Sequence, residues 1–440
     1  MKIICKTALC LLLCVAMLGG AIIGLTSCGK SSPTLMTLDD ITVTQAQYTF
    51  LLCRAKAAYE QAGFTVKDWD TKIDLDGTTY DQYVRQQVLA ETKLMMAGVA
   101  LFEKEGLSLP KSTTDAIDNE IKEFIEYHGE GSKSAFNTLL ATYGFNADML
   151  REQYIFEAKY EYMKDYLYGE DGSKIAATAK QEYLNRNGVA FKQLLIRAYR
   201  YVYETDTNGD EVYYLADANN GKTNNIAYNA KVGVSRTDEF GKTLTDKNGD
   251  IIYYLANGKI AYDKENGVRA ITFDATGNPV TKALSKDELT ENLGIAEDLK
   301  SSVEARDFLG FEAAVAEYTD SGDDTFMGSG ELCFLYTTGD NNYDYLNDIA
   351  DELAEAEVGE IRIINSEYGY NVVMKYDIPE NAVSNTAYAE WFSEAPSLST
   401  RVLQYLFSNK CKDLLESVVV DNDVFVTCPN IADVSANYKY

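Results

Sequence analysis

Histidine is almost missing from this sequence of 440 residues, because His128 is the only one. A zinc site in a protein is usually built from several His or Cys ligands, and a Ser-His or Cys-His couple needs an imidazole beside its nucleophile. His128 follows Glu126 and Tyr127 and precedes Gly129, in a pattern typical of a helix end. We therefore expect no catalytic role for His128, no metal and no other cofactor.

Cysteines are also few once they are sorted by position. Three of the eight lie in an apolar N-terminal segment and a fourth is Cys28. The remaining four are widely spaced and form no C-x-x-C pair: Cys53, Cys333, Cys411 and Cys428. This spacing argues against a zinc site and favours buried free thiols. It leaves open a disulfide between Cys411 and Cys428.

Positive charge is scarce as well. The sequence holds 40 Lys and Arg against 68 Asp and Glu, which gives a net charge of −28. Nucleic acids and anionic lipid surfaces attract basic proteins, so an acidic chain is a poor partner for both. We therefore expect no binding of nucleic acid, and any attachment to a membrane must depend on something other than charge.

The N-terminus supplies such an attachment. Lys2 and Lys6 precede an uncharged apolar run over residues 8–23, and the tetrapeptide Leu-Thr-Ser-Cys ends at Cys28. The layout predicts a cleavable signal peptide over residues 1–27, although an apolar run of this length also suits an uncleaved anchor. The tetrapeptide resembles the bacterial lipobox, whose cysteine carries lipid, and two or more acyl chains hold a protein stably. We expect a lipoprotein anchored through Cys28 on the extracytoplasmic face of the cell membrane.

A short polar tether over residues 28–37 should lead into an all-helical domain over residues 38–187. Thr44 followed by Gln47 fits a capping box at the start of the first helix. Apolar residues at helical spacing then predict further helices over residues 80–105, 113–127, 132–143, 146–168 and 175–187.

The pattern changes to short β-like runs at Gly188, and we expect a mixed domain over residues 188–378. An insertion at about 199–275 contains a duplication, since Thr-Asp-x-Asn-Gly-Asp occurs at 205–210 and again at 245–250. Each Asn-Gly precedes an aromatic strand, which predicts plain β-hairpins. The alternation of Asp206, Asn208 and Asp210 leaves a calcium loop as the alternative, although the closing Glu of such a loop is missing.

The mixed domain resembles the parvulin-type peptidyl-prolyl isomerases. Five segments carry this resemblance in the family's order: Gln-Leu-Leu-Ile at 193–196, Thr-Asp-Ser at 319–321, Ser-Gly-Glu-Leu at 329–332, Gly-Glu-Ile at 359–361 and Tyr-Gly-Tyr-Asn-Val-Val at 368–373. Together with the helices before it, a helix near 400–417 and the lipid anchor, the chain is similar to foldase lipoproteins with a helical chaperone domain. The resemblance implies that residues 379–440 form a C-terminal helix and tail that pack on the helical domain.

The resemblance also implies a cleft, and several of its residues depart from the family. Gln193 and Asn371 stand where the family has histidines, and Asp320 or Ser321 stands where it has Asp or Cys. Leu346 replaces the Phe of the proline pocket, with Asn342 where the family often has Met. Amides still donate and accept hydrogen bonds, but they offer no ring and no titration near neutral pH. We expect weak or no isomerase activity.

These observations predict an α+β protein in which an all-helical chaperone-like domain precedes a parvulin-like α/β domain with a hairpin insertion. The function implied is that of a membrane-anchored folding factor, whose partners are unfolded or extended exported polypeptides. An active prolyl isomerase is the first alternative. A surface binding or adhesion lipoprotein is the second, in which the acidic, Tyr-rich surface and the insertion form a recognition face.

Overall fold

A computed structural model describes residues 32–65, 67–73, 77–216, 222–321, 323–339, 341–394 and 396–440. The expected signal peptide over residues 1–27 and the expected lipidated Cys28 therefore lie outside the described residues. Within the described ranges, no helix is both long enough and apolar enough to cross a membrane. The described residues combine helices with strands, so the fold is α+β.

The chain divides into two compact units. The first, called here the helical unit, comprises the chain up to Ala190, Phe334–Ala354 and Asp377–Tyr440. The second, called the sheet unit, comprises Phe191–Cys333 and Glu355–Tyr376. Residues 334–354, which fall inside the expected parvulin-like range of 188–378, are thus part of the helical unit.

The first helix begins where the sequence predicts. Helix α2 (Gln45–Gln61) has Thr44 as its N-cap, and the Thr44 side chain accepts a hydrogen bond from the backbone N–H of Gln47. The Gln47 Oε1 accepts in return from the backbone N–H of Thr44 at 2.8 Å. This reciprocal pair satisfies two backbone donors that a helix start leaves open, and the predicted capping box is confirmed.

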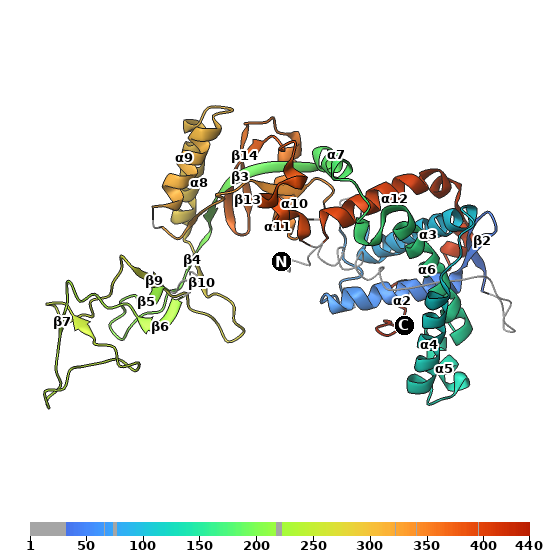
Figure 1. Ribbon diagram of the computed structural model, residues 1–440, viewed down its shortest axis with the longest axis horizontal. Helices are drawn as coiled ribbons and strands as arrows, with labels where there is room; N and C mark the ends of the chain where they lie inside the picture. Colours follow the sequence, from blue (N-terminus) through green and yellow to red (C-terminus); the bar gives the residue numbers. More distant parts are fainter. Residues whose placement is uncertain are drawn as a thin grey trace. The chain divides into compact units, whose positions relative to one another are not determined.

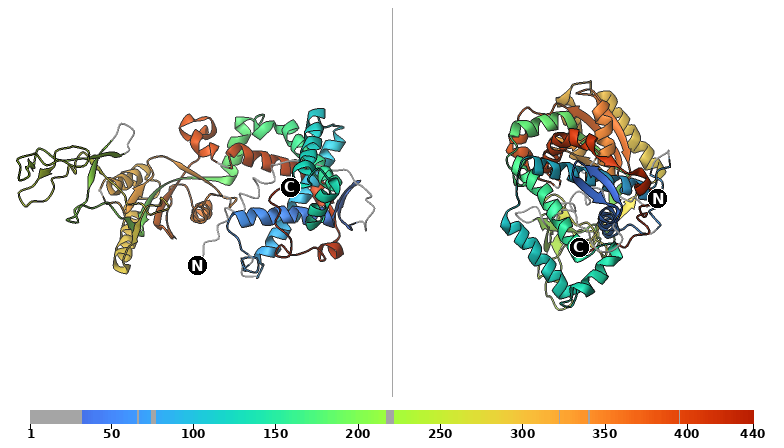
Figure 2. Two further views of the ribbon diagram at one scale, coloured as in Figure 1. Left: turned by 90° about the horizontal axis from the view of Figure 1, so that it is seen from below. Right: turned by 90° about the vertical axis from the view of Figure 1, so that its right-hand side faces the viewer.

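The other predicted helices are present within three residues of their expected ends. They gather in the helical unit, as Figure 1 and Figure 2 show, and their bounds are α3 (Tyr80–Lys104), α4 (Lys111–His128), α5 (Lys133–Leu140), α6 (Ala147–Tyr168) and α7 (Ala177–Asn187). The apolar stripes of α3, α4, α5 and α6 face two clusters of buried side chains. Burial of one stripe per helix explains why the 3.6-residue period in the sequence is so clear.

A β-hairpin precedes α2, where the sequence analysis expected the end of a tether. Strands β1 (Thr34–Leu38) and β2 (Ile41–Thr44) pair antiparallel, and Leu35 and Met36 are fully buried. The apolar run in β1 is too short to show a period of its own. It also pairs with β15 (Val419–Val420) from the other end of the chain, which a local pattern cannot reveal.

The C-terminal part of the chain completes the core of the helical unit. Helix α12 (Leu398–Ser417) packs against α3, and Phe407 and Cys411 lie in the same buried cluster as Val99. All four cysteines of the described chain are buried and free, so Cys411 and Cys428 do not pair. The preference for buried free thiols is confirmed.

The sheet unit is built on four strands in the order β11 (Phe326–Gly328), β3 (Gly188–Arg197), β14 (Gly369–Tyr376) and β13 (Ile361–Ser366). Helices α8 (Lys286–Ser302) and α9 (Phe308–Thr319) supply side chains to the core on one face of this sheet. Strand β12 (Cys333–Tyr336) also pairs with β3, and both strands carry the chain from one unit into the other. Of the five segments that carry the family resemblance, 193–196 and 368–373 contribute to β3 and β14, and 359–361 leads into β13. Segment 319–321 ends α9, and segment 329–332 links β11 to β12.

The insertion consists of short hairpins closed by β4 (Tyr199–Tyr201) and β10 (Thr281–Ala283). In the first duplicated turn, Asp206 Oδ1 accepts from the backbone N–H groups of Asn208 and Asp210 at 2.8 and 3.0 Å. Asp246 makes the same two contacts in the second turn. These carboxylates stabilise tight turns, as the Asn-Gly pattern predicts.

The remaining short strands of the insertion are β5 (Tyr213–Ala216), β6 (Lys222–Ile226), β7 (Val234–Ser235), β8 (Tyr253–Tyr254) and β9 (Gly267–Arg269). Strand β5 lies between β6 and β9, and β7 pairs with β8. Three more helices complete the helical unit: α10 (Asp344–Glu355), most of which belongs to it, α11 (Ala389–Ser393) and α13 (Asn422–Phe425).

Gly369 is the position where the sheet depends most directly on a glycine. Its φ of 136° is rarely adopted by other residues, and a Cβ there would overlap the carbonyl oxygen of Ile196 on β3. We predict that Gly369→Ala lowers the free energy of unfolding by more than about 1 kcal/mol, measured by urea denaturation.

Gly277→Ala is the matched control. Gly277 lies in the same unit with a φ of +86°, and nothing stands within 4 Å of the added methyl group. Gly277→Ala therefore adds the backbone strain of a positive φ without an overlap between the new Cβ and a neighbouring atom. If both variants lose the same stability, the close approach of Gly369 to β3 is refuted.

Candidate functional site

Two residues of the predicted cleft lie on neighbouring strands of the sheet. Gln193 belongs to β3 and Asn371 to β14, and these strands are adjacent. Side chains alternate between the two faces of a strand. Leu194 and Val372 lie in the core with α8 and α9, so Gln193 and Asn371, one residue away, point to the opposite face. The structure therefore places these two amides on one face.

Both amides have an unused acceptor. The fully buried Asn371 donates through Nδ2 to Ile364 O at 3.3 Å and to Ser366 Oγ at 3.1 Å. Its Oδ1, like Oε1 of Gln193, finds no hydrogen-bond partner among the described residues. An unpaired buried acceptor costs roughly 1–3 kcal/mol. Gln193 and Asn371 thus each leave a buried acceptor that no described residue satisfies.

Asp320 and Ser321 lie elsewhere in the sheet unit. Asp320 ends α9 and lines a cavity of about 280 Å³ together with Lys192. Lys192 precedes Gln193 on β3, so the two side chains point to opposite faces. Ser321 is exposed, and its Oγ accepts from the backbone N–H of Asp323 at 3.2 Å. Asp320 therefore lies on the face opposite the two amides.

The cavity beside Asp320 is dominated by a charged network. Lys192 Nζ lies 3.0 Å from Glu312 Oε1, and the hydroxyl of Tyr376 donates to the same oxygen at 3.1 Å. Burial, together with the Glu312 carboxylate, raises the pKa of Tyr376 well above its usual range. This network keeps the phenol protonated and holds α9 to the sheet, and it accounts for the polar groups in that cavity.

Leu346 and Asn342 belong to the helical unit. Both line a cavity of about 40 Å³, with side chains from β12 and from the C-terminal part of the chain. Of the five residues expected in the cleft, Gln193 and Asn371 are the pair that the structure gathers on one face. Asp320 lies on the opposite face of the sheet, Ser321 lies in an exposed turn, and Leu346 belongs to the helical unit.

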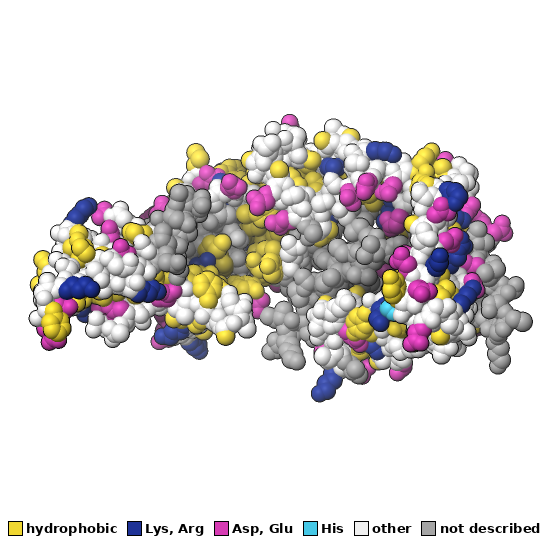
Figure 3. All heavy atoms as spheres, turned by 60° about the horizontal axis from the view of Figure 1, so that its bottom comes forward, with side chains coloured by type: hydrophobic (Ala, Val, Ile, Leu, Met, Phe, Trp, Pro, Cys, Tyr) yellow, Lys and Arg dark blue, Asp and Glu magenta, His cyan; other side chains and the backbone are white. Residues whose placement is uncertain are grey.

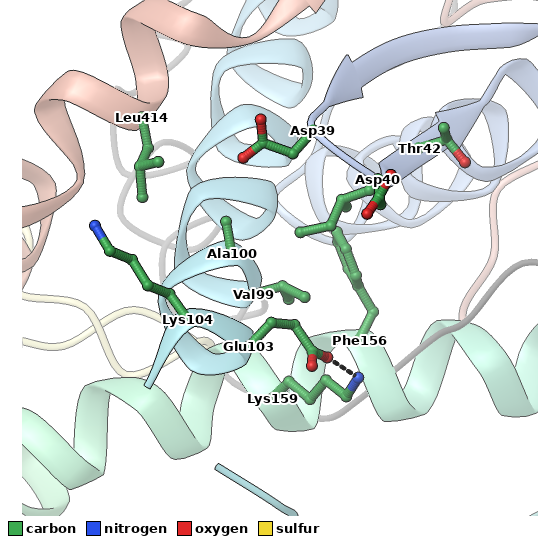
Figure 4. Close-up of a pocket in the computed structure, with 11 residues that line it drawn as sticks. Asp39, Asp40, Thr42, Val99, Ala100, Glu103, Lys104, Phe156, Lys159 and Leu414 are labelled. Atoms are coloured by element: carbon green, nitrogen blue, oxygen red, sulfur yellow. Dashed lines mark hydrogen bonds and ion pairs between the residues drawn. The ribbon is translucent and has the colours of Figure 1, made fainter. Parts of the chain in front are cut away.

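A cavity of about 740 Å³ that the sequence does not predict lies in the helical unit. Figure 4 shows residues of α3 and α6 facing the β1–β2 turn across it. Its lining comes from four places in the sequence: Asp39, Asp40, Ile41, Thr42, Val99, Ala100, Glu103, Lys104, Phe156, Lys159 and Leu414. No local pattern brings these residues together, so the sequence carries no signal for the cavity.

The cavity combines an apolar wall with a charged rim. Val99, Ala100 and Phe156 form the wall, and Asp39 and Asp40 stand at the turn of the hairpin. Lys159, which is only 7% exposed, forms an ion pair with Glu103, drawn as a dashed line in Figure 4. Because this lysine is already neutralised by Glu103, the two aspartates outweigh Lys104 and the lining keeps a small net negative charge.

His128 packs among aromatic side chains. Its ring lies 5.9 Å from the ring of Phe124 and 5.5 Å from the ring of Tyr440, in an aromatic cluster at the end of α4. Within the described residues, no group of three or more His, Cys, Asp or Glu side chains is arranged to hold a metal ion. Acidic side chains spread over the face drawn in Figure 3, as the net charge of −28 leads one to expect.

Comparisons with known proteins give little further information. No family model matches the chain, and no curated protein matches it. Among solved structures, PrsA from Bacillus subtilis is a weak neighbour, with 12% sequence identity over 82% of this chain and 94% of that chain. The TM-score of 0.16 is too low to establish a shared fold.

Proposed function

We propose that this chain is a lipid-anchored folding factor on the extracytoplasmic face of the cell membrane, which binds unfolded or extended exported polypeptides. In this proposal, the helical unit is the chaperone part, and the parvulin-like part has lost most or all of its isomerase activity. The observation that carries the chaperone part is the cavity of about 740 Å³ between the β1–β2 hairpin, α3, α6 and α12.

The cavity has the properties that binding of varied apolar side chains requires. Its volume lies within the range of roughly 300–1,000 Å³ that is typical of ligand sites, so it has room for more than one side chain. The wall of Val99, Ala100 and Phe156 gains free energy by burying apolar surface without demanding a particular sequence. The acidic rim of Asp39 and Asp40 favours segments that carry a Lys or Arg beside an apolar residue.

The polar pair on the sheet supports the loss of catalysis. Rotation about a prolyl peptide bond faces a barrier of roughly 18–20 kcal/mol, and an isomerase lowers it by fitting a twisted amide in a matched pocket. Gln193 and Asn371 share a face, as two cooperating groups would, but their amides are smaller than imidazole rings and do not titrate near neutral pH. Asp320 lies on the opposite face, so the surface around the amides lacks its carboxylate.

The first prediction tests the cavity. We predict that Ala100→Trp, which places an indole in the cavity, weakens suppression of aggregation of a denatured model protein about tenfold, a loss of about 1.4 kcal/mol in binding. Ala90→Trp is the matched control, because Ala90 lies on the same helix, is exposed and does not line the cavity. Both variants must unfold at similar temperatures. Equal chaperone activity of the two would refute the cavity as the binding place.

The second prediction tests catalysis. Uncatalysed prolyl isomerisation takes about 10–100 s at 25 °C, so a proline-limited refolding reaction reports even modest acceleration. We predict little acceleration by the natural chain and some gain when Gln193→His and Asn371→His are combined. Each single variant should gain less, because neighbouring groups on one face act together. Strong activity of the natural chain, lost in Asn371→Ala, would instead establish the active isomerase alternative.

The third prediction tests the anchor. Lipid attachment through a thioether needs the sulfur of Cys28, and no other side chain replaces it. We predict that Cys28→Ala leaves the protein as an uncleaved precursor or releases it from membranes, as measured by fractionation and by the mass of the N-terminal peptide. Cys53→Ala, which changes a buried thiol of the folded part, should leave membrane attachment unchanged. A normally processed, membrane-bound Cys28→Ala protein would rule out lipid anchoring.

A further inference from the structure

A C-terminal segment of the helical unit packs on β12. This segment, called the cap, consists of residues 388–394 and Pro396. The ring of Phe334 lies 5.0 Å from the ring of Tyr388 and 5.2 Å from the ring of Phe392. Phe334 is only 3% exposed, so these rings bury it. The aromatic contacts hold the cap on a surface that it reaches from another part of the sequence.

The cap also lines the small space beside Leu346. Trp391, Glu394 and Pro396 line the same cavity as Asn342 and Leu346, and the volume that remains is about 40 Å³. A single water molecule needs roughly 10–15 Å³ by this measure. The remaining space thus takes a few waters and no prolyl ring. While the cap is in place, the predicted proline pocket is closed.

An arginine fixes the end of the cap. Arg401 on α12 is 6% exposed, and its guanidinium carbon lies 4.2 Å from the centre of the Tyr336 ring. Its Nε donates to the carbonyl oxygen of Pro396 at 3.0 Å. A guanidinium over an aromatic face gains roughly 0.5–2 kcal/mol, most when it is shielded from water. Arg401 therefore joins Pro396 to the wall of the cavity.

The wall itself does not depend on the cap. Asn341 accepts through Oδ1 from the backbone N–H of Tyr336 at 2.9 Å, and its Nδ2 donates to Tyr336 O at 2.7 Å. Its Nδ2 also donates to Oδ1 of Asn347 at 2.9 Å. These bonds join β12 to the start of α10 and are buried. The wall is therefore ordered before any ligand arrives, which lowers the entropy lost on binding.

We propose that the surface formed by Phe334, Tyr336, Asn342 and Leu346 is a binding site for short helical segments that carry aromatic residues and are followed by a proline. The cap, whose residues 389–393 form α11, occupies this site as an intramolecular ligand. The proposal deepens the proposed function and rests on it, since it gives the region around Leu346 a ligand class. A ligand tethered by a short linker acts at an effective concentration of about millimolar. Clients in solution must displace the cap, so this site is inhibited until they do.

The test uses the whole mature chain and a labelled peptide with the sequence of residues 386–397, followed by fluorescence anisotropy. Trp391→Ala combined with Phe392→Ala removes the anchoring rings of the cap and should lower the Kd of the peptide at least about tenfold relative to the natural chain. Glu390→Gln is the matched control, because Glu390 is exposed on the same helix and does not line the cavity. Adding Leu346→Lys to the double variant should abolish the gain.

Hydrogen exchange of the natural chain gives a second measurement that needs no variant. An excess of the peptide should speed exchange of the backbone amides of residues 388–394, because these residues leave their site. Unchanged exchange together with equal Kd values for the double variant and the natural chain would overturn the proposal. Aggregation assays separate the two ideas. If the natural chain suppresses aggregation but the peptide tests fail, the proposal on the cap alone is refuted. If the peptide binds but aggregation is not suppressed, the folding function is refuted.

Discussion

The core of the helical unit needs the C-terminal part of the chain, which follows the sheet unit in the sequence. Lys56 on α2 is 7% exposed, and its ammonium donates to the carbonyl oxygens of Ala432 and Val434 at 2.8 and 2.7 Å. A buried ammonium is very unfavourable without such partners. The C-terminal tail therefore completes the first helix of the unit, and the N-terminal helices of the chain cannot satisfy their own buried groups. In the sequence, most of the sheet unit lies between the two parts of the chain that form this core.

The same C-terminal part of the chain contributes to both of the proposed binding sites. Leu414 of α12 closes one side of the large cavity, whose other walls come from the N-terminal half of the chain. Arg401, three turns earlier on α12, holds Pro396 beside the wall of the smaller one. One helix thus contributes to two sites. A change that loosens α12 in the core would affect both sites, which gives the helix a part in client binding beyond packing.

Local patterns predicted much of this molecule, and the parts that they missed depend on distant pairs. The cap at Thr44, the helix ends and the Asp206 turn are determined by residues a few positions apart, so the sequence shows them directly. Strand β1 pairs with β15, and the large cavity needs four distant segments, so no local pattern reveals them. The face shared by Gln193 and Asn371 follows from strand alternation once the strands are adjacent. The assignment of Leu346 to the helical unit follows from the division of the chain into two units, which no spacing predicts.

The distribution of the sites has a consequence for how such a protein loses catalysis. The large cavity and the capped site both lie in the helical unit, whereas the amide pair lies on the sheet. Replacing rings by amides at Gln193 and Asn371 removes shape and titration without touching the residues that line either cavity. The proposed binding of polypeptides would therefore be separable from isomerisation. Under selection for binding alone, the core of the sheet with Leu194 and Val372 would be kept. The residues on its polar face could then change.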